Sequence, residues 1–417
     1  MKNIFAEIIS IGDEILYGQT LDTNSHFISQ KLDEIGVKVF RKTTIADKEE
    51  NILKAFKEAE NNADIILITG GLGPTNDDLT KPCLSKYFDS PIVINDQALA
   101  QITEFFAKRG YELTELNRMQ AALPEACEML ANPKGTAPGM WFDKNGKVFV
   151  SMPGVPHEMK YLVENEVLPR VKARFELPVI YHKMIKTIGL GESFLADRIK
   201  TWEDNLPPHI RLAYLPSLGE VKLRLTATGK DINKLEKEVE MLVDKLIPLI
   251  EKYIYGFGED TLESAVGRLL KDAGSTLATA ESCTGGLLAH MITSVPGSSA
   301  YFKGSIVAYA NQVKIEQLDV DEILLEKHGA VSEEVVVKMA ENVRKILNTT
   351  YGLAITGIAG PDGGTPEKPV GTVWIAYADS NESISRQLKL VRDRNFNVQM
   401  SAKALLALLY RKLANID

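Results

Sequence analysis

Apolar residues in the N-terminal part of the chain occur in two alternating patterns. Short runs of strand length that are rich in apolar residues cover residues 5–11, 37–43 and 63–69. Residues 24–35 and 47–61 instead repeat apolar positions every three or four residues, as helices that pack on one face do. The run at 63–69 is strongly apolar, which indicates a strand buried on both faces of a parallel sheet. This order predicts a doubly wound α/β domain over residues 1–170.

The pattern changes after a connector expected at 169–178. Two strands and two helices are predicted at 181–188, 220–228, 192–202 and 233–252. They indicate a small α+β domain over residues 171–257. The α/β pattern then returns over residues 258–417. Its predicted helices cover 262–273, 332–347 and 397–414, and its apolar strands begin at 276, 304, 351 and 371.

A polar, glycine-containing turn follows the strand at 276–280. A serine in such a turn, Ser282, lies at the C-terminal edge of a sheet, beside N–H groups at a helix N-terminus that can bind a developing oxyanion. Alternatively, Ser282 or Thr284 only caps the helix. Lys314, in a polar turn after 304–308, offers a base, because a serine hydroxyl needs one and burial can lower a lysine pKa. One helix cannot pair two residues so far apart in the sequence, but the strand ends of an open α/β sheet can bring their loops together.

Five motifs in this region resemble the C-terminal domain of the CinA family: AESCTGG, GSSAYFKGSIVAYANQVK, HGAVSEEV, TGIAGPDGG and KPVGTVWIA. The resemblance implies an amidase that hydrolyses nicotinamide mononucleotide to nicotinate mononucleotide and ammonia with a Ser/Lys dyad and no metal. It makes Ser282 the nucleophile, Lys314 the base and Tyr309 a further catalytic residue. The family's late GDR-type motif reads Arg392-Asp393-Arg394 here. The substrate-binding residues carried over are Glu281, Thr284, Gly285, Gly286, Thr356, Gly357 and Arg394.

The strand at 63–69 runs into a second glycine-rich loop, which ends in Asp77 and Asp78. Its glycines let backbone N–H groups approach an anion closely. The two carboxylates would repel a bare phosphate, so a divalent cation between them and the phosphate is one interpretation. The other is an aspartate that caps a helix. A third loop, at 152–159, follows a strand at 147–151. It either contributes to a binding site or is only a rigid turn that starts a helix.

The motifs GDEILYGQTLDTN, TGGLGPTNDD and MPGVPHEM resemble the MoaB/MogA-like domain of CinA proteins. Founding members of that family bind molybdopterin. In CinA proteins the domain implies metal-dependent hydrolysis of ADP-ribose, with Mg²⁺, Mn²⁺ or Co²⁺ held by Asp77 and Asp78. The substrate-binding residues carried over are Asp13, Glu14, Asn24, Gly70, Gly71, Gly73, Pro74, Thr75, Gly154 and Glu158. The family also implies a KH-like middle domain, here without a basic GXXG loop and therefore expected to be a structural spacer.

Composition limits the function classes. The chain of 417 residues carries a net charge of −8, which argues against a general nucleic-acid partner. Its three cysteines are scattered, as expected in the cytoplasm, and no apolar run is long enough for a membrane helix. The expected partners are the two small nucleotides and a second copy of the chain in a homodimer. The alternative function is a non-enzymatic pterin- or nucleotide-binding protein associated with competence, which would not need both Ser282 and Lys314.

Overall fold

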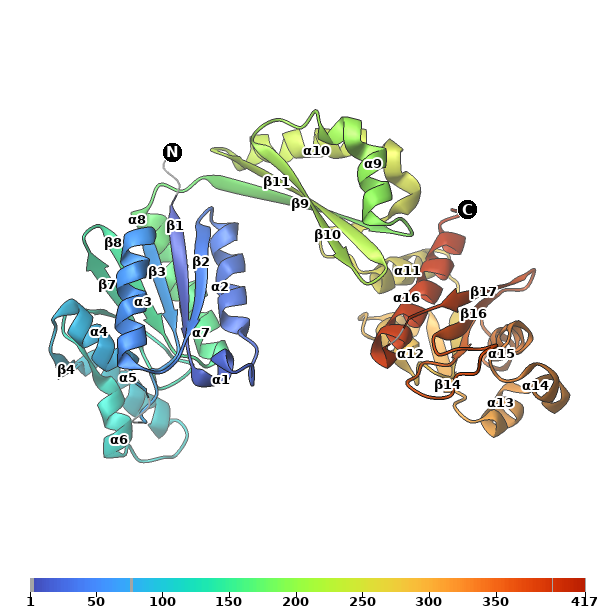
Figure 1. The fold of residues 1–417 in the computed structure, drawn as a ribbon, viewed down its shortest axis with the longest axis horizontal. Helices are drawn as coiled ribbons and strands as arrows, with labels where there is room; N and C mark the ends of the chain where they lie inside the picture. Colours follow the sequence, from blue (N-terminus) through green and yellow to red (C-terminus); the bar gives the residue numbers. More distant parts are fainter. Residues whose placement is uncertain (1–3, 76–77, 392, 417) are drawn as a thin grey trace. The chain divides into compact units, whose positions relative to one another are not determined.

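The computed structural model describes residues 4–75, 78–391 and 393–416. They form two compact units (Figure 1). The first contains the described residues up to Tyr181 together with Thr228–Leu235, and the second contains His182–Ala227 and the residues from Glu236 onward.

The first unit is built on a six-stranded sheet with the order β2-β1-β3-β8-β7-β6. Its parallel strands are β1 (Phe5–Ile11), β2 (Lys38–Ile45), β3 (Ile65–Thr69) and β8 (Lys147–Met152). Two antiparallel strands extend it, β7 (Gly139–Lys144) and β6 (Glu128–Leu130). A small separate sheet pairs β4 (Ile92–Ile94) with β5 (Ala122–Pro124).

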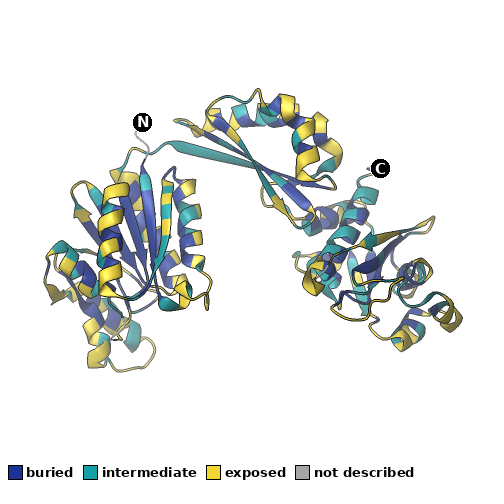
Figure 2. Ribbon diagram, in the orientation of Figure 1, coloured by how far each residue is buried: buried dark blue, intermediate teal, exposed yellow. Residues whose placement is uncertain are grey.

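Helices cover both faces of this sheet, which explains why β3 is apolar from Ile65 to Ile68. Ile65 and Leu67 pack into one hydrophobic cluster, whereas Ile66 and Ile68 pack into the other. The central strands are accordingly buried (Figure 2). One face holds α2 (Thr23–Glu34), α7 (Pro156–Leu162) and α8 (Leu168–Arg174). The other holds α3 (Glu49–Asn62), α4 (Thr80–Phe88) and α5 (Asp96–Ala107), and the short helices are α1 (Asp13–Leu16) and α6 (Glu115–Arg118).

The connector predicted at 169–178 is wrong for its first half. Residues up to Arg174 belong to helix α8, with Pro169 in the first turn. Helix α8 continues directly from the π-helical turn Val163–Val167, and the changed hydrogen-bond pattern of that turn accommodates a residue without an N–H. The buried Val171 then anchors the helix to the sheet.

The middle of the chain forms a four-stranded sheet with the order β10-β11-β9-β12. Its strands are β9 (Val179–Ile188), β10 (Ile210–Ser217), β11 (Glu220–Gly229) and β12 (Ile254–Phe257), and its helices are α9 (Glu192–Glu203) and α10 (Ile232–Ile250). The sequence predicted β9, β11 and both helices. It missed β10, because the residues of this segment show no clear strand pattern. The antiparallel pairing with β11 makes the segment a strand.

The C-terminal sheet has five strands in the order β14-β13-β15-β16-β17. They are β13 (Leu277–Glu281), β14 (Phe302–Val307), β15 (Tyr351–Gly357), β16 (Thr372–Ala378) and β17 (Ser383–Lys389), of which the first three run parallel. One face carries α11 (Leu262–Asp272), α12 (Leu287–Thr293) and α16 (Arg394–Leu413). The other carries α13 (Asn311–Leu318), α14 (Glu322–His328) and α15 (Glu333–Ile346).

Helix α13 corrects the prediction that Lys314 lies in a turn. Lys314 and Leu318 are the buried residues of this short helix. Because one of its two buried positions is a lysine, the segment has no apolar period from which a helix could be predicted.

Candidate active site

Ser282 lies where three parallel strands of the C-terminal sheet end together. Its backbone N–H donates to the carbonyl of Ile355 at 3.0 Å, on the β15 side. On the β14 side, the N–H of Ala308 donates to the carbonyl of Glu281 at 2.8 Å. These bonds fix the backbone on either side of the turn, and the serine itself is only 8% exposed.

The carboxylate of Glu281 holds the turn that follows Ser282. It is fully buried and accepts hydrogen bonds from the N–H groups of Gly286 at 3.1 Å, Leu288 at 3.0 Å and Ala289 at 2.8 Å. The N-cap of α12 is Gly286, with a φ of 102° that favours glycine, and no side chain caps the helix from that position. The alternative that Ser282 or Thr284 caps α12 is therefore wrong.

The same bonds correct a second expectation. The N–H groups at the start of α12 were expected to bind an oxyanion, but those of Gly286, Leu288 and Ala289 already donate to Glu281. Glu281 therefore stabilises the turn through hydrogen bonds to α12, and the hydroxyl of Ser282 does not cap this helix.

Lys314 reaches Ser282 from α13. Its Nζ lies 3.3 Å from Ser282 Oγ and donates to the carbonyl of Ala308 at 2.8 Å. The side chain is 1% exposed, and burial lowers its pKa from the ordinary lysine value, while the neighbouring Cys283 opposes the shift. Burial also raises the pKa of the Cys283 thiol to about 12, so the thiol stays protonated and does not compete as a nucleophile.

A cavity of about 290 Å³ opens at this pair. Six residues predicted from the sequence line it: Ser282, Tyr309, Lys314, Thr356, Gly357 and Arg394. Four others, Glu281, Thr284, Gly285 and Gly286, are not among its lining residues. The sequence analysis missed Asn311 and Asp362, and only Asp362 had a visible signal, as the acidic residue of a glycine-rich loop.

Arg394 and Tyr309 meet at the edge of this cavity. The guanidinium donates to the carbonyl of Gly360 at 2.8 Å and to the hydroxyl of Tyr309 at 3.0 Å. Thr356 donates its hydroxyl to the carbonyl of Ala330 at 2.8 Å. Both Arg394 and Tyr309 are exposed, so the arginine keeps donors for a ligand anion. Arg392 of the same motif lies outside the described residues.

The N-terminal unit has a cavity of about 410 Å³ at the ends of β1, β3 and β8. Nine predicted residues line it: Glu14, Asn24, Gly70, Gly71, Gly73, Pro74, Asp78, Gly154 and Glu158. Asp13 and Thr75 do not line it, and Asp77 lies outside the described residues. The sequence analysis missed Asp47, Gln120 and Thr136. These residues lie in segments without a glycine-rich signature.

Asn24 joins two of the loops that form this cavity. Its Nδ2 donates to Thr69 Oγ1 at 3.0 Å and to the carbonyl of Gly154 at 2.8 Å. Its Oδ1 is buried without a hydrogen-bond partner among the described residues, which leaves an acceptor for a ligand. At Gly70, a Cβ would lie 2.1 Å from the carbonyl oxygen of Ile11, so only glycine allows this close approach.

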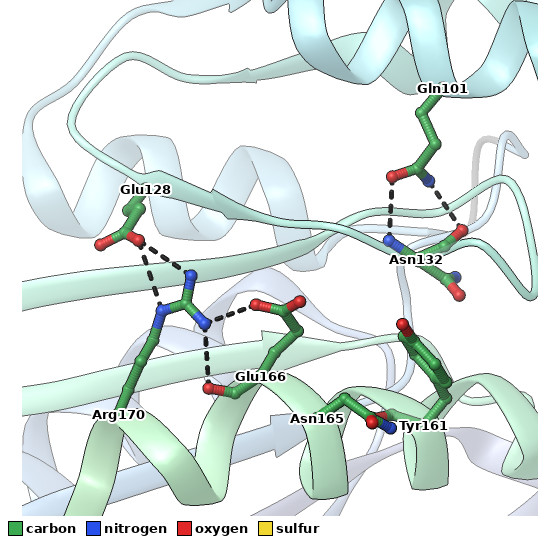
Figure 3. Close-up of polar contacts among 7 residues, drawn as sticks. All are labelled: Gln101, Glu128, Asn132, Tyr161, Asn165, Glu166 and Arg170. Atoms are coloured by element: carbon green, nitrogen blue, oxygen red, sulfur yellow. Dashed lines mark hydrogen bonds and ion pairs between the residues drawn. The ribbon is translucent and has the colours of Figure 1, made fainter. Parts of the chain in front are cut away.

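Glu158 is held in place by an amide pair that Figure 3 shows. Gln101 donates to the carbonyl of Asn132 at 2.7 Å and accepts from its N–H at 3.0 Å. The side chain of Asn132 then donates to Glu158 at 2.6 Å. Burial raises the pKa of Glu158, and the bond from Asn132 opposes that shift.

Figure 3 also shows that Arg170 bridges Glu128 and Glu166, which connects β6 to the helical segment that carries Glu166 and Arg170.

Asp78 and Asp47 place two carboxylates at this cavity. Asp78 accepts from the N–H of Gly73 at 2.8 Å and from the N–H and hydroxyl of Thr75 at 3.0 and 2.6 Å, so it braces its own loop. The N-cap of α4 is Leu79, so Asp78 is not a helix cap. Burial raises the pKa of Asp47, and the nearby carboxylates, among them Asp13, add to the rise.

These carboxylates fit a cation better than an anion, because neighbouring negative charge adds to the burial that raises the pKa of Asp47, and Asp13 Oδ1 is buried without a partner among the described residues. In the part of the chain that the structure describes, no three His, Cys, Asp or Glu side chains form a metal-binding group. Mg²⁺ needs only one or two carboxylates when substrate phosphates complete its shell.

Three family models match consecutive parts of the chain. They are the probable molybdopterin binding domain over residues 7–173, the damage-inducible protein CinA KH domain over 182–256 and the CinA C-terminal domain over 259–413. A CinA-like protein of Cytophaga hutchinsonii is 52% identical and covers 99% of both chains. The chain belongs to the CinA family. A CinA-like protein of Flavobacterium psychrophilum is 46% identical over 98% of each chain.

Among solved structures, a CinA protein of Thermoplasma acidophilum is 35% identical, with a TM-score of 0.38, and covers 42% of this chain and 99% of its own. The resemblance to the CinA family and the MoaB/MogA-like, KH and CinA C-terminal architecture are thus confirmed. No helix within the described residues is long and apolar enough to cross a membrane.

Proposed function

We propose that the C-terminal domain hydrolyses the carboxamide of nicotinamide mononucleotide. The observation that carries this proposal is the contact between Ser282 and Lys314. A buried lysine with a lowered pKa, 3.3 Å from a serine hydroxyl, is a general base beside its nucleophile. A purely binding domain would have no use for this pair, whose lysine costs free energy to bury.

The reaction follows from these two groups. Neutral Lys314 takes the hydroxyl proton of Ser282, and Oγ attacks the carboxamide carbon. The C–N bond breaks as Lys314 returns the proton to the leaving nitrogen, and ammonia departs. Water, deprotonated by the same amine, then cleaves the ester and regenerates Ser282. The Lys314 ammonium that forms in the first step also stabilises the developing oxyanion, because it lies in a buried, low-dielectric site.

Arg394 is positioned to select the nucleotide. Its exposed guanidinium suits the phosphate of a mononucleotide, and its bonds to Gly360 and Tyr309 hold it in place before substrate arrives. We expect Asn311 and Asp362, two further polar residues of the cavity lining, to contact the ribose.

Ammonia release from nicotinamide mononucleotide by the full chain tests this function. Lys314→Arg is the sharpest variant, because arginine keeps the positive charge but cannot lose its proton. We expect no measurable turnover from this variant, and full turnover from Lys303→Arg as a matched control at an exposed position of β14. Turnover by Lys314→Arg would disprove the role of Lys314, and an inactive wild-type protein would disprove the substrate.

For the N-terminal domain we propose metal-dependent hydrolysis of ADP-ribose. The supporting observation is the lining of the cavity. It contains the carboxylates Glu14, Asp47, Asp78 and Glu158, but no lysine or arginine among the described lining residues. A pyrophosphate would therefore meet only like charge unless a cation came with it.

Asp47 and Asp78 would hold the cation, together with Asp77, which lies outside the described residues. When bound, Mg²⁺, Mn²⁺ or Co²⁺ would neutralise the pyrophosphate and polarise the phosphorus that water attacks. The chain's own groups would orient the substrate. The N–H groups of Gly70 and Gly73 already donate to Met152 and Asp78, so Gly71 is the loop glycine left to donate to a phosphate, and Asn24 Oδ1 would accept a hydrogen bond.

A binding-only role for this domain is the second candidate, favoured by its match to a molybdopterin binding domain. The two candidates differ in one measurement. Incubating the full chain with ADP-ribose and metal should release AMP and ribose 5-phosphate. Binding of ADP-ribose or a pterin without products would favour the binding role.

A further inference from the structure

A further cavity, of about 200 Å³, lies within the second unit, between the middle sheet and the last helix. One wall is a single face of α16, because its lining residues recur at helical spacing. They are Met400, Lys403, Ala404, Ala407, Leu408 and Arg411. The middle domain adds Ile188 and Gly189 at the end of β9 and Gly219 in the β10–β11 turn, and β17 adds Arg386. Neither proposed reaction uses any of these residues.

The two domains are packed together at this cavity. Lys403 Nζ lies 3.0 Å from the buried carboxylate of Glu220, which follows the β10–β11 turn. The hydroxyl of Tyr410 donates to the carbonyl of Ile254 at 3.0 Å. Ile188 belongs to the same hydrophobic cluster as the buried face of α16. These contacts between the two domains therefore hold both sides of the cavity in place.

The charged residues that line the cavity are all cationic among the described residues. Its lining is mostly apolar, with Ile188, Met400 and Leu408 as the floor, and Arg386 and Arg411 are the two arginines among its lining residues. The charge of Lys403 is matched by Glu220. Arg386 and Arg411 have no ion pair with any carboxylate that the structure describes, and no acidic residue lines the cavity in the described ranges. Two unmatched cations beside an apolar floor suit a ligand with the opposite arrangement.

We propose that this cavity binds a small organic anion, namely a carboxylate or phosphate group carried on an apolar body. The planar fork of arginine matches either oxyanion, and the floor removes the apolar body from water. An inorganic anion would leave the floor solvated, and an uncharged apolar molecule would leave both guanidinium groups without a partner. The middle domain then completes a ligand site in addition to its structural role.

Calorimetric titration of the full chain tests this proposal with three probes: benzoate, phenyl phosphate and the uncharged benzamide. We expect at least one of the two anions to bind and benzamide to bind at least about tenfold more weakly, because it lacks the charge that the arginines meet. The anion that binds more tightly identifies the oxyanion class. These are binding measurements, so their outcome does not depend on either proposed reaction.

Two kinds of variant locate the binding. Arg386→Gln and Arg411→Gln should each weaken the preferred anion by about tenfold. Lys389→Gln, which removes an exposed cation from the same strand as Arg386 but outside the cavity, should change nothing. Ala407→Phe should fill the floor and abolish binding, and unchanged circular dichroism would show that the variants are folded.

Three results would overturn the proposal. The first is equal affinity for benzamide and the two anions, or no binding by either anion up to about 10 mM. The second is binding that survives both arginine replacements and Ala407→Phe. The third is tight binding of a single-stranded oligoribonucleotide that the arginine variants abolish while neither anion competes, which would make this surface a nucleic-acid site.

Discussion

The two proposed active sites differ in what their side chains can do unaided. The C-terminal cavity brings a nucleophile and a base into contact, at 3.3 Å, in a buried position. The N-terminal cavity, as far as its described lining shows, has acceptors and carboxylates but no serine, cysteine, histidine or lysine. In the proposed reactions, the first site therefore acts on its substrate with its own side chains, whereas the second uses a bound cation as electrophile.

Both cavities nevertheless occupy the same place in their sheets, at the carboxyl ends of parallel strands. They lie beyond β13, β14 and β15 in one domain and beyond β1, β3 and β8 in the other. This edge collects the loops of an open α/β sheet, so topology locates a site without defining its chemistry. The comparison teaches that the loop residues decide the reaction, and separate perturbations should therefore affect only one site each.

Ser282→Ala should have the largest effect. It removes the covalent nucleophile, so ammonia release should fall by at least about 10³-fold, while ADP-ribose hydrolysis stays unchanged. Ser294→Ala, at the end of α12, is the control and should retain activity. Turnover of nicotinamide mononucleotide by Ser282→Ala within tenfold of wild type would rule out the covalent mechanism.

Chelation should have the opposite selectivity and affect only the N-terminal activity. EDTA should abolish ADP-ribose hydrolysis and added Mg²⁺ should restore it, while ammonia release is unaffected. Asp47→Asn should lower ADP-ribose turnover by about 10–100-fold, because it weakens the cation site. ADP-ribose hydrolysis that resists both EDTA and this replacement would mean that Asp47 and Asp78 only shape the loops.

Glu281→Gln tests whether Glu281 contacts substrate or holds the turn. The glutamine amide would point a donor at backbone N–H groups that now share two carboxylate oxygens, which should misplace Ser282 and lower kcat by about tenfold. KM should change little. A raised KM with unchanged kcat would instead support the direct substrate contact expected from the sequence.

The smallest effect concerns stability and its dependence on pH. Since burial lowers the pKa of Lys314, the unfolded chain binds more protons than the folded chain between that pKa and the ordinary value of 10.5. Wild-type stability therefore rises with pH through this window, and Lys314→Met removes the rise. Relative to wild type, the Tm of Lys314→Met should be highest near neutral pH and should fall as the pH approaches about 10, by about 2–4 °C for each kcal/mol involved. A Tm difference that is constant over this range would mean that the folded pKa is not lowered.

Local patterns were enough to predict most of the sheet strands that end at the two sites. The apolar runs of β3, β13 and β15 and the glycine-containing turns after them are properties of consecutive residues. They also led to Ser282 and Lys314 as partners. Helix α13 was missed because Lys314 is buried at a position where an amphipathic helix would show an apolar residue.

The local pattern of apolar and polar residues could not predict contacts between distant segments. Nothing near Asp47 indicates a site, and only the pairing of β1 with β2 brings it beside Asp13. Glu281 belongs to a substrate-binding motif by sequence, but the path of the turn directs its oxygens to α12.

The sequence by itself determined the three-domain order, the parallel strands and the candidate pair Ser282 and Lys314, because burial periodicity and turn chemistry are local. Only the tertiary structure decided that Lys314 Nζ meets Ser282 Oγ, that Glu281 braces the turn, and that α16 closes a third cavity against the middle domain. Those outcomes depend on strand register and helix packing, which place side chains far apart in the chain within a few ångströms of each other.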